Sequence, residues 1–208
     1  MILTEERVIP KLMNPTNGLL KEHIVRYEFA ARFAKGRVLD IACGVGYGAS
    51  ILIETLYGRH IEKIIGVDSD EESIRYAREH YNGHQVEYFT MDALAKNLDK
   101  QLGLFDTIIS FETIEHLEED VLFIEHLNKL LKPGGTLIIS TPFGRGRALP
   151  CTNPFHMHQY KEEEFLEMLS DFEQVEMYHQ INGTIELPLK NKKYYLMIAV
   201  CRQAKSLL

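Results

Sequence analysis

The chain has no tryptophan, only three cysteines and no apolar run long enough to cross a bilayer. A membrane-spanning helix needs about 20 mostly apolar residues, so a membrane partner is not expected. Cys43, Cys151 and Cys201 are scattered without the spacing of a metal or redox site, which is typical of reduced thiols. The first residues also lack the apolar core of a secretory signal. These absences predict a cytoplasmic protein.

Positive charge is sparse as well. The formal net charge is −7, and lysine and arginine form no stripe that could follow a phosphate backbone, so nucleic acid is not expected as a partner. With 208 residues and 45% apolar composition, the chain is long and apolar enough for one α/β domain with a sizeable core. We expect a single domain over residues 1–208. The composition specifies no oligomeric state.

Short apolar segments alternate with segments of helical period along the first two thirds of the chain. The expected strands are 38–42, 63–68, 86–92, 105–111 and 136–141. Strict alternation with helices implies right-handed crossovers and a parallel sheet. Two further strands, 173–179 and 194–202, follow each other without a helix and should pair antiparallel. The predicted fold is a doubly wound, Rossmann-like sheet of seven strands, mostly parallel with an antiparallel last strand, and with helices on both faces.

Two segments stand outside this alternation. Residues 1–35 comprise an irregular lead-in and a helix from about 18 to 34, which we expect to form a helical cap over the ligand cleft. Residues 143–160 contain turn-forming residues without a period and start after the fifth expected strand. Uninterrupted loops of that length are usually functional or disordered. We therefore expect residues 143–160 to form a substrate loop that moves as a lid.

A glycine-rich turn joins the first strand to the next helix. Gly44, Gly46 and Gly48 occupy every second position, so the inner side of the turn carries no Cβ atoms and the backbone can approach a ligand. The helix that follows offers unpaired N–H groups. Asp40 lies at the carboxyl end of the strand, where α/β sheets bind ligands. A carboxylate only accepts hydrogen bonds, so Asp40 favours an ammonium group over a pyrophosphate.

This combination resembles the first motif of the class I S-adenosylmethionine (SAM) methyltransferases. Four further segments match that family in order, namely Asp68 after the second strand, Thr90-Met91-Asp92-Ala93 after the third, Phe105 to His116 with its F-D-x-I and E-H elements, and Leu131-Lys132-Pro133-Gly134-Gly135-Thr136-Leu137. Five matches in order between residues 38 and 141 make the resemblance specific. It covers essentially the whole chain and weakens after Phe143.

The resemblance implies SAM as the cofactor. The expected cofactor-binding residues are Asp40, Ala42, Gly44, Gly46, Asp68, Ser69, Asp92, Ala93 and Phe111. In this interpretation Asp40 and the glycine turn hold the methionine end, Asp68 accepts the ribose hydroxyls and Asp92 accepts the adenine amino group. For both Asp68 and Asp92 the alternative is a cap on the segment that follows.

Four residues are candidates on the acceptor side. His116, after the fourth strand, is the candidate general base, because the pKa of histidine suits proton transfer near neutrality. Its alternative role is to pack against or cap the next helix. Arg145, His156 and His158 are candidate substrate-binding residues in the loop. We expect no metal, because no third ligand stands at a recognisable spacing from His156 and His158.

The sequence therefore predicts SAM-dependent methyl transfer to oxygen or nitrogen of a small-molecule metabolite. An RNA or protein methyltransferase is the alternative within this fold. An NAD-dependent oxidoreductase is the alternative of another class, since Gly44, Gly46 and Ala49 also satisfy G-x-G-x-x-A. Asp40, Asp92 and the lack of a Tyr-x-x-x-Lys pair argue against it. A third alternative is a SAM-binding module without activity.

Overall fold

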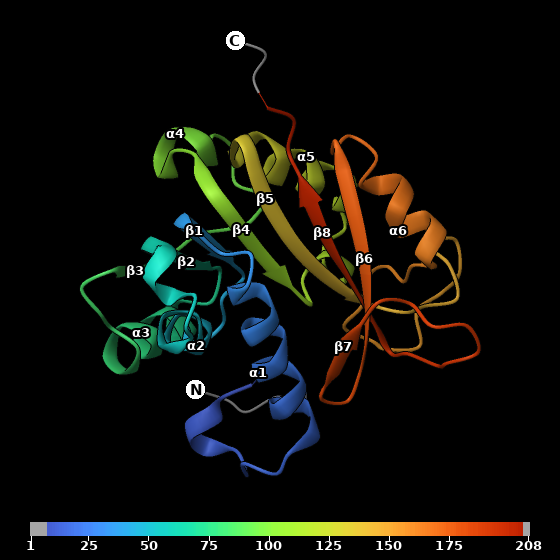
Figure 1. Ribbon diagram of the computed structural model, residues 1–208, viewed down its shortest axis with the longest axis horizontal. Helices are drawn as coiled ribbons and strands as arrows, with labels where there is room; N and C mark the ends of the chain where they lie inside the picture. Colours follow the sequence, from blue (N-terminus) through green and yellow to red (C-terminus); the bar gives the residue numbers. More distant parts are fainter. Residues whose placement is uncertain (1–7, 206–208) are drawn as a thin grey trace.

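The protein is built around one sheet of eight strands, seen in a computed structural model that describes residues 8–205. The strands are β1 (Gly36–Ile41), β2 (Ile61–Asp68), β3 (Val86–Thr90), β4 (Phe105–Phe111), β5 (Leu131–Pro142), β6 (Gln174–Ile181), β7 (Thr184–Glu186) and β8 (Leu196–Arg202). Their order across the sheet is β3-β2-β1-β4-β5-β8-β6-β7 (Figure 1). Residues 1–7 of the predicted lead-in lie outside the described residues.

The order of the strands creates a switch point between β1 and β4. Strands β1 to β5 run parallel to one another, whereas β8 runs antiparallel to both β5 and β6. The chain builds outward from β1 through β2 to β3, and then returns to place β4 on the other side of β1. Ligands of open α/β sheets bind outside the carboxyl ends of the strands at such a point.

Helices cover both faces of the sheet (Figure 1). They are α1 (Gly18–Ala31), α2 (Tyr47–Glu54), α3 (Glu71–His80), α4 (Leu98–Leu102), α5 (Asp120–Leu130) and α6 (Glu162–Met168), with the short 3-10 helices η1 (Pro10–Leu12), η2 (Gly58–His60) and η3 (Ile114–His116). Buried side chains of α1, α2 and α3 pack in one core, and those of α4, α5 and α6 pack in the other.

The strands supply both cores because neighbouring residues point to opposite faces. In β1, Val38 belongs to the core beneath α1–α3, and Leu39 to the core beneath α4–α6. Ile64 and Ile65 divide in the same way in β2. This two-sided burial explains why the strands read as continuous apolar runs.

The predicted fold class is confirmed, including the mostly parallel sheet, the antiparallel pairing of the final strands and the helices on both faces. The predicted number of seven strands was one too low. The missed strand β7 has only three residues and pairs with β6 across a turn at Asn182 and Gly183. Three residues are too few to reveal an alternating pattern. The short helix α4 was also missed.

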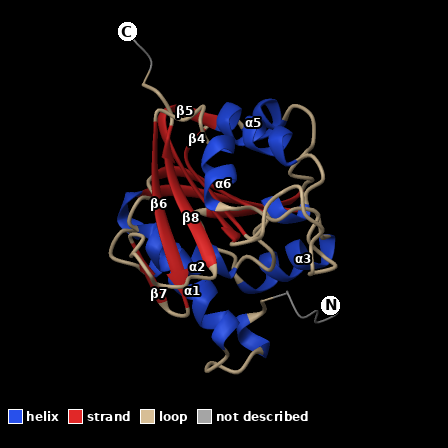
Figure 2. Cartoon of the chain, turned by 90° about the vertical axis from the view of Figure 1, so that its right-hand side faces the viewer, coloured by secondary structure: helices blue, strands red, loops and turns tan. Residues whose placement is uncertain are grey.

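Residues 143–160 form no helix or strand beyond a single bridge between Phe143 and Tyr160. The loop leaves the carboxyl end of β5 and returns to η3, where the backbone carbonyl of Glu115 accepts from the N–H groups of Met157 and His158 at 2.8 and 3.1 Å. Figure 2 draws the loops of the chain in tan. The loop therefore lies at the same edge of the sheet as the exits of β1 and β4.

Two further features bear on the sequence predictions. Among residues 8–205, no helix has both the length and the apolar character that crossing a bilayer requires. The three cysteines all fall within these residues and are free thiols, with Cys43 and Cys201 buried and Cys151 half-buried.

Candidate functional site

A cavity of about 640 Å³ lies at the switch point. Much of its wall comes from five segments that are distant in sequence. They are α1 with Leu19, His23 and Tyr27, the exit of β1 with Ala42 and Gly44, the exit of β2 with Asp68 and Ser69, the exit of β4 with Phe111, Glu112, Glu115 and His116, and the loop with Asn153 and His156. The carboxyl ends of parallel strands thus gather the candidate residues in one place.

Two non-glycine residues have left-handed backbone conformations at the cavity wall. Ala42 follows β1 with φ 59°, and Glu112 follows β4 with φ 49°. Residues other than glycine rarely adopt this region of φ and ψ, and such backbone strain concentrates at ligand sites. Both residues turn the chain away from its strand where the cavity begins.

The three glycines of the turn have different roles. Gly44 has φ 54° and no atom within 4 Å of the position of a Cβ, and it lines the cavity. A Cβ on Gly46 would lie 2.7 Å from Ala77 and from the Tyr88 ring, and one on Gly48 would lie 2.2 Å from the Tyr27 ring. The interpretation of all three as room for a ligand is therefore corrected, because Gly46 and Gly48 make room for protein side chains.

Asp40 lies beneath the turn and is not part of the cavity wall. Its side chain is buried, and both carboxylate oxygens accept from the Tyr27 hydroxyl, at 3.1 and 3.2 Å. Burial raises the pKa of Asp40 to about 7, with the Tyr27 hydrogen bond opposing and the charge of Asp68 adding to this shift. Tyr27, which does line the cavity, stands between Asp40 and a ligand.

Asp68 and Ser69 line the cavity next to Gly44. The Asp68 carboxylate accepts from the N–H of Gly44 at 2.8 Å and from the N–H of Asp70 at 2.9 Å. The cap of α3 is Asp70, whose side chain accepts from the N–H groups of Glu72 and Ser73. The alternative in which Asp68 caps this helix is therefore wrong, and each Asp68 oxygen keeps a lone pair for a ligand.

Asp92 and Ala93 follow β3 but are not among the residues that line the cavity. The exposed Asp92 side chain accepts from the N–H of Leu94 at 2.8 Å. This contact matches the alternative of a local cap. A contact between Asp92 and the adenine stays a prediction.

Two carboxylates meet at the exit of β4. Glu112 accepts from the Ser140 hydroxyl at 2.9 Å, and Oε2 of Glu115 accepts from the Thr141 hydroxyl at 3.0 Å. Glu115 is 1% exposed, and its Oε1 has no hydrogen-bond partner. Burial, with the charge of Glu112 adding to it, raises the pKa of Glu115 well above the usual range.

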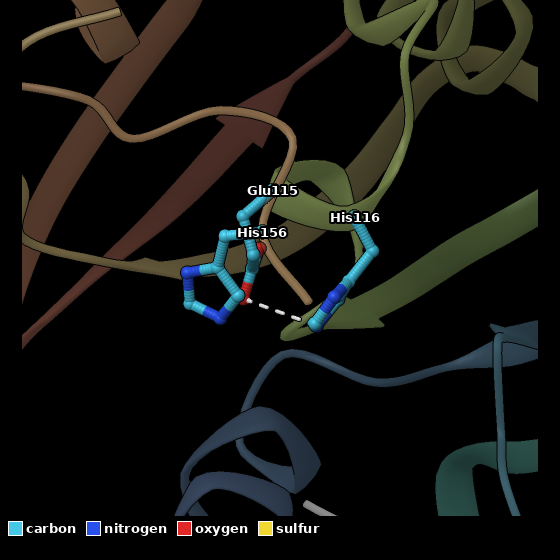
Figure 3. A group of neighbouring side chains, drawn as sticks. All are labelled: Glu115, His116 and His156. Carbon is cyan, nitrogen blue, oxygen red and sulfur yellow. Dashed lines mark ion pairs between the residues drawn. The ribbon is translucent and has the colours of Figure 1, made fainter. Parts of the chain in front are cut away.

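His116 points its free nitrogen toward this carboxylate. Its Nδ1 lies 2.9 Å from the carbonyl oxygen of Phe155, and a carbonyl can only accept, so Nδ1 carries a proton; in the neutral imidazole Nε2 then holds the lone pair. Nε2 lies 4.0 Å from Oε1 of Glu115. The ring of His156 meets the ring of His116 edge-on, with centroids 4.9 Å apart (Figure 3). The alternative of capping does not hold, since α5 starts after Glu119.

Arg145 and His158 have contacts outside the main cavity. The Arg145 guanidinium donates to the carbonyl of Pro150 at 2.8 Å, and Arg145 does not line the cavity. Nε2 of His158 lies 3.0 Å from the carbonyl of Glu118. His158 lines an adjoining hollow of about 170 Å³ together with His156. Of the three predicted loop residues, only His156 reaches the main cavity.

The sequence analysis missed several cavity residues, above all His23, Tyr27 and Tyr47. Nδ1 of His23 lies 2.9 Å from the Tyr47 hydroxyl, and burial lowers the pKa of His23 well below its usual value. His23 and Tyr27 stand four residues apart on α1, so they share a helix face. That spacing was a readable signal, because a cap over the cleft must present one face to it.

Comparisons with known proteins also indicate a methyltransferase. Residues 33–200 match the methyltransferase domain family. A protein of Mycolicibacterium smegmatis named a probable S-adenosylmethionine-dependent methyltransferase is 30% identical over 171 residues, which are 80% of this chain and 63% of that protein. A ubiquinone biosynthesis O-methyltransferase of Chelativorans sp. (strain BNC1) is 36% identical over 124 residues, 57% of this chain and 46% of that protein. The chain thus spans less than two thirds of the length of these relatives.

Solved structures share the fold at low sequence identity. The N-methyltransferase NodS from Bradyrhizobium japonicum WM9, in complex with S-adenosyl-L-homocysteine (SAH), matches with a TM-score of 0.63 at 19% identity, over 91% of this chain and 88% of that one. The [4+2]-cyclase SpnF matches with a TM-score of 0.70 at 14% identity, over 94% and 86% of the two chains. At such identities the likeness establishes the architecture alone.

Proposed function

The chain belongs to the family of SAM-dependent methyltransferases, and from this premise we propose that it transfers the methyl group of SAM to oxygen or nitrogen of a small-molecule acceptor. The observation that carries the proposal is the single cavity at the switch point. One end of it has Gly44, Asp68 and Ser69, and the other has Glu115, His116 and His156. A cofactor and an acceptor bound at these ends would share one cavity.

The cofactor end suits an adenosine with an amino acid attached. Asp68 offers two carboxylate oxygens to the ribose hydroxyls, while Ala42 and Gly44 leave backbone open to the methionine part. Asp68 pairs with Thr90 across β2 and β3, so Asp92 lies two residues beyond that partner. This register supports our proposal that Asp92 and Ala93 border the adenine, next to the ribose.

Aromatic side chains border the proposed methyl path. The rings of Phe111 and Tyr27 pack edge-on with centroids 5.2 Å apart, and both line the cavity. In the reaction, the acceptor atom bonds to the methyl carbon, the carbon–sulfur bond breaks, and its electron pair goes to sulfur, which becomes a neutral thioether. Much of the catalysis of such a displacement is positioning and exclusion of water. A hydroxyl acceptor must also lose its proton, and the Nε2 lone pair of His116 can accept it.

The acceptor is proposed to enter between α1 and the loop of residues 143–160. Residues of α1, within the proposed cap of residues 1–35, and of the loop face each other across the cavity, as Leu19 and His23 do with Asn153 and His156. Together they support the assignment of the first segment as a cap and the second as a substrate loop. Arg145 and His158 would then contact only an acceptor that extends beyond the main cavity.

Two relatives' names bear on the acceptor class. Ubiquinone biosynthesis O-methyltransferases match about half of this chain, which favours a hydroxyl of a small molecule over RNA or protein. Family membership removes the NAD-dependent oxidoreductase from consideration. A SAM-binding module without activity is the remaining alternative. We further propose a cytoplasmic location, in keeping with the three free thiols.

Binding and turnover measurements test the proposal. Calorimetry should give micromolar binding of SAM and SAH and no binding of NAD. Incubation of the full chain with methyl-labelled SAM and a panel of phenolic, alcoholic and amine metabolites should then yield a labelled product and SAH. Binding of NAD in place of SAM would overturn the cofactor assignment. SAM binding without turnover of any acceptor would favour the module without activity.

A further inference from the structure

Three potential metal ligands converge at the acceptor end of the cavity. Glu115 and His116 come from η3, and His156 comes from the loop of residues 143–160 (Figure 3). One ligand atom from each of the three lies within 4.8 Å of the other two. Two imidazoles and one carboxylate form a donor set that several divalent metals bind in proteins.

The contacts of His116 select the neutral tautomer that binds a metal through Nε2. Its Nδ1–H donates to the carbonyl of Phe155, which leaves the Nε2 lone pair directed toward Glu115. Metal-binding histidines commonly donate their second ring N–H in this way, and the bond fixes both tautomer and ring orientation. The carbonyl belongs to the residue before His156, so the same hydrogen bond also positions the loop.

Glu115 provides an independent indication of a cation site. Its side chain is 1% exposed, and Oε2 is satisfied by the Thr141 hydroxyl. Oε1 has no hydrogen-bond partner and faces Nε2 of His116. A buried carboxylate oxygen without a partner is costly, and a coordinated cation relieves that cost.

Backbone hydrogen bonds hold the two segments in this register. The carbonyl of Glu115 accepts from the N–H groups of Met157 and His158, the two residues after His156. The N–H of His156 in turn donates to the carbonyl of Asn153 at 3.2 Å. The three ligands therefore stand on backbone that is fixed on both sides.

The spacing suits a single ion after small side-chain adjustments. Nitrogen and oxygen ligands bind Zn²⁺ at about 2.0–2.2 Å, which places them about 3–3.5 Å from one another. Rotations of the half-exposed His116 and His156 side chains can close the present separations. We propose that Glu115, His116 and His156 bind one divalent transition-metal ion, with at least one coordination position open to the cavity.

The ion would define the acceptor class, a step that rests on the proposed function. In this arrangement Nε2 of His116 binds the ion, and the ion takes over the part of the base. A hydroxyl that coordinates the open position loses its proton to solvent water, because a Lewis acid stabilises the oxygen anion. That oxygen then attacks the methyl carbon of SAM, and the carbon–sulfur pair goes to sulfur. The acceptor is therefore a hydroxyl compound and not an amine.

Direct metal titration tests the site without any turnover. The full chain, without an affinity tag and stripped with a chelator, is titrated with Zn²⁺ by calorimetry and with Co²⁺ by visible absorption. We expect one ion per chain, micromolar or tighter, with the absorption bands of Co²⁺ bound to nitrogen and oxygen ligands. His116→Ala, His156→Ala and Glu115→Gln should each weaken binding by at least about tenfold.

The control is His80→Ala, which removes an exposed histidine of α3 and should bind both metals like the original chain. Equal binding by the original chain and by His156→Ala, whose residue lies in a loop outside the helices and strands, would overturn the site. Absence of 1:1 binding would do the same. SAH binding is measured in parallel: a chain that binds SAH but no metal refutes this inference alone, and one that binds metal but neither SAM nor SAH refutes the proposed function alone.

Discussion

The Tyr27 hydroxyl of α1 donates to both carboxylate oxygens of Asp40 at the end of β1. The ring of the same tyrosine occupies the space that a Cβ on Gly48 would need. One side chain of α1 therefore contacts both the acid and a glycine of the first motif. The motif depends on α1 for its shape as well as on its own residues.

Asp40 makes the stability of the cofactor-free protein depend on pH. Its pKa is about 7 in the fold and about 3.9 in the unfolded chain. Between these values the folded state binds more protons, so this group's contribution to stability falls as pH rises from about 4 to 7. Asp40→Asn does not ionise at this position and lacks this loss. Its free energy of unfolding, relative to that of the original chain, should therefore rise by about 2–4 kcal/mol between pH 5 and pH 8. Denaturant unfolding at both pH values measures the gain, and a pH-independent difference would contradict it.

Asp68→Ala should weaken the binding of SAH by about 1.5–3 kcal/mol, because it removes charge-assisted hydrogen bonds to the ribose. Calorimetry measures the change. Asp99→Ala, which removes an exposed carboxylate of α4, is the control for general loss of negative charge and should bind SAH normally. Unchanged affinity in Asp68→Ala would show that this carboxylate serves only the N–H groups of Gly44 and Asp70.

Gly48→Ala should destabilise the protein by about 1–3 kcal/mol, although alanine favours helices, because the added methyl overlaps the Tyr27 ring. Thermal unfolding at constant pH measures the loss. Gly18→Ala is the matched control at the start of α1, where a Cβ would have no atom within 4 Å. A Gly48→Ala protein as stable as the control would mean that Tyr27 can move aside freely.

Arg147→Ala should loosen the substrate loop. The Arg147 guanidinium donates twice to the buried Asp120 carboxylate, at 2.8 and 2.7 Å, and thereby fastens the loop to the start of α5. We expect faster proteolytic cleavage within residues 143–160 and a higher KM for the acceptor, with SAM affinity within about twofold. Arg75→Ala, on the exposed side of α3, should change none of these. A selective loss of SAM affinity would show that the loop serves the cofactor.

The sequence was sufficient to predict the fold because the patterns that indicate strands and turns lie within short segments of the chain. Val38 and Leu39 serve opposite cores, so β1 had to read as a continuous apolar run, and the glycine turn after it identified the crossover. The same local reading located the exits of β2 and β4, where Asp68, Phe111 and His116 reach the cavity. Strand β7, with three residues, and helix α4, with five, were too short to predict from the sequence.

The details of the site depend on contacts between distant segments. Asp40 meets Tyr27 from another element, and His156 meets Glu115 and His116 across some forty residues of chain. The prediction that excluded a metal considered only ligands spaced along the loop, with His158 as the neighbour of His156. In the structure, His158 instead lies near the carbonyl of Glu118, and the two side chains close to His156 come from η3. No periodic pattern in the sequence indicates that His156 lies beside residues of η3.

The hydrogen bond from His116 to the carbonyl of Phe155 has a consequence for side reactions. This bond and the two hydrogen bonds that the Glu115 carbonyl accepts join the loop of residues 143–160 to the groups that would act on the acceptor. Withdrawal of residues 155–158 would break these bonds and carry His156 away from His116. When the entrance is open, His156 and His116 would therefore be separated. Water that enters with the acceptor would then meet the sulfonium without a group to activate it. The attachment of the loop to these groups would therefore suppress hydrolysis of the methyl donor.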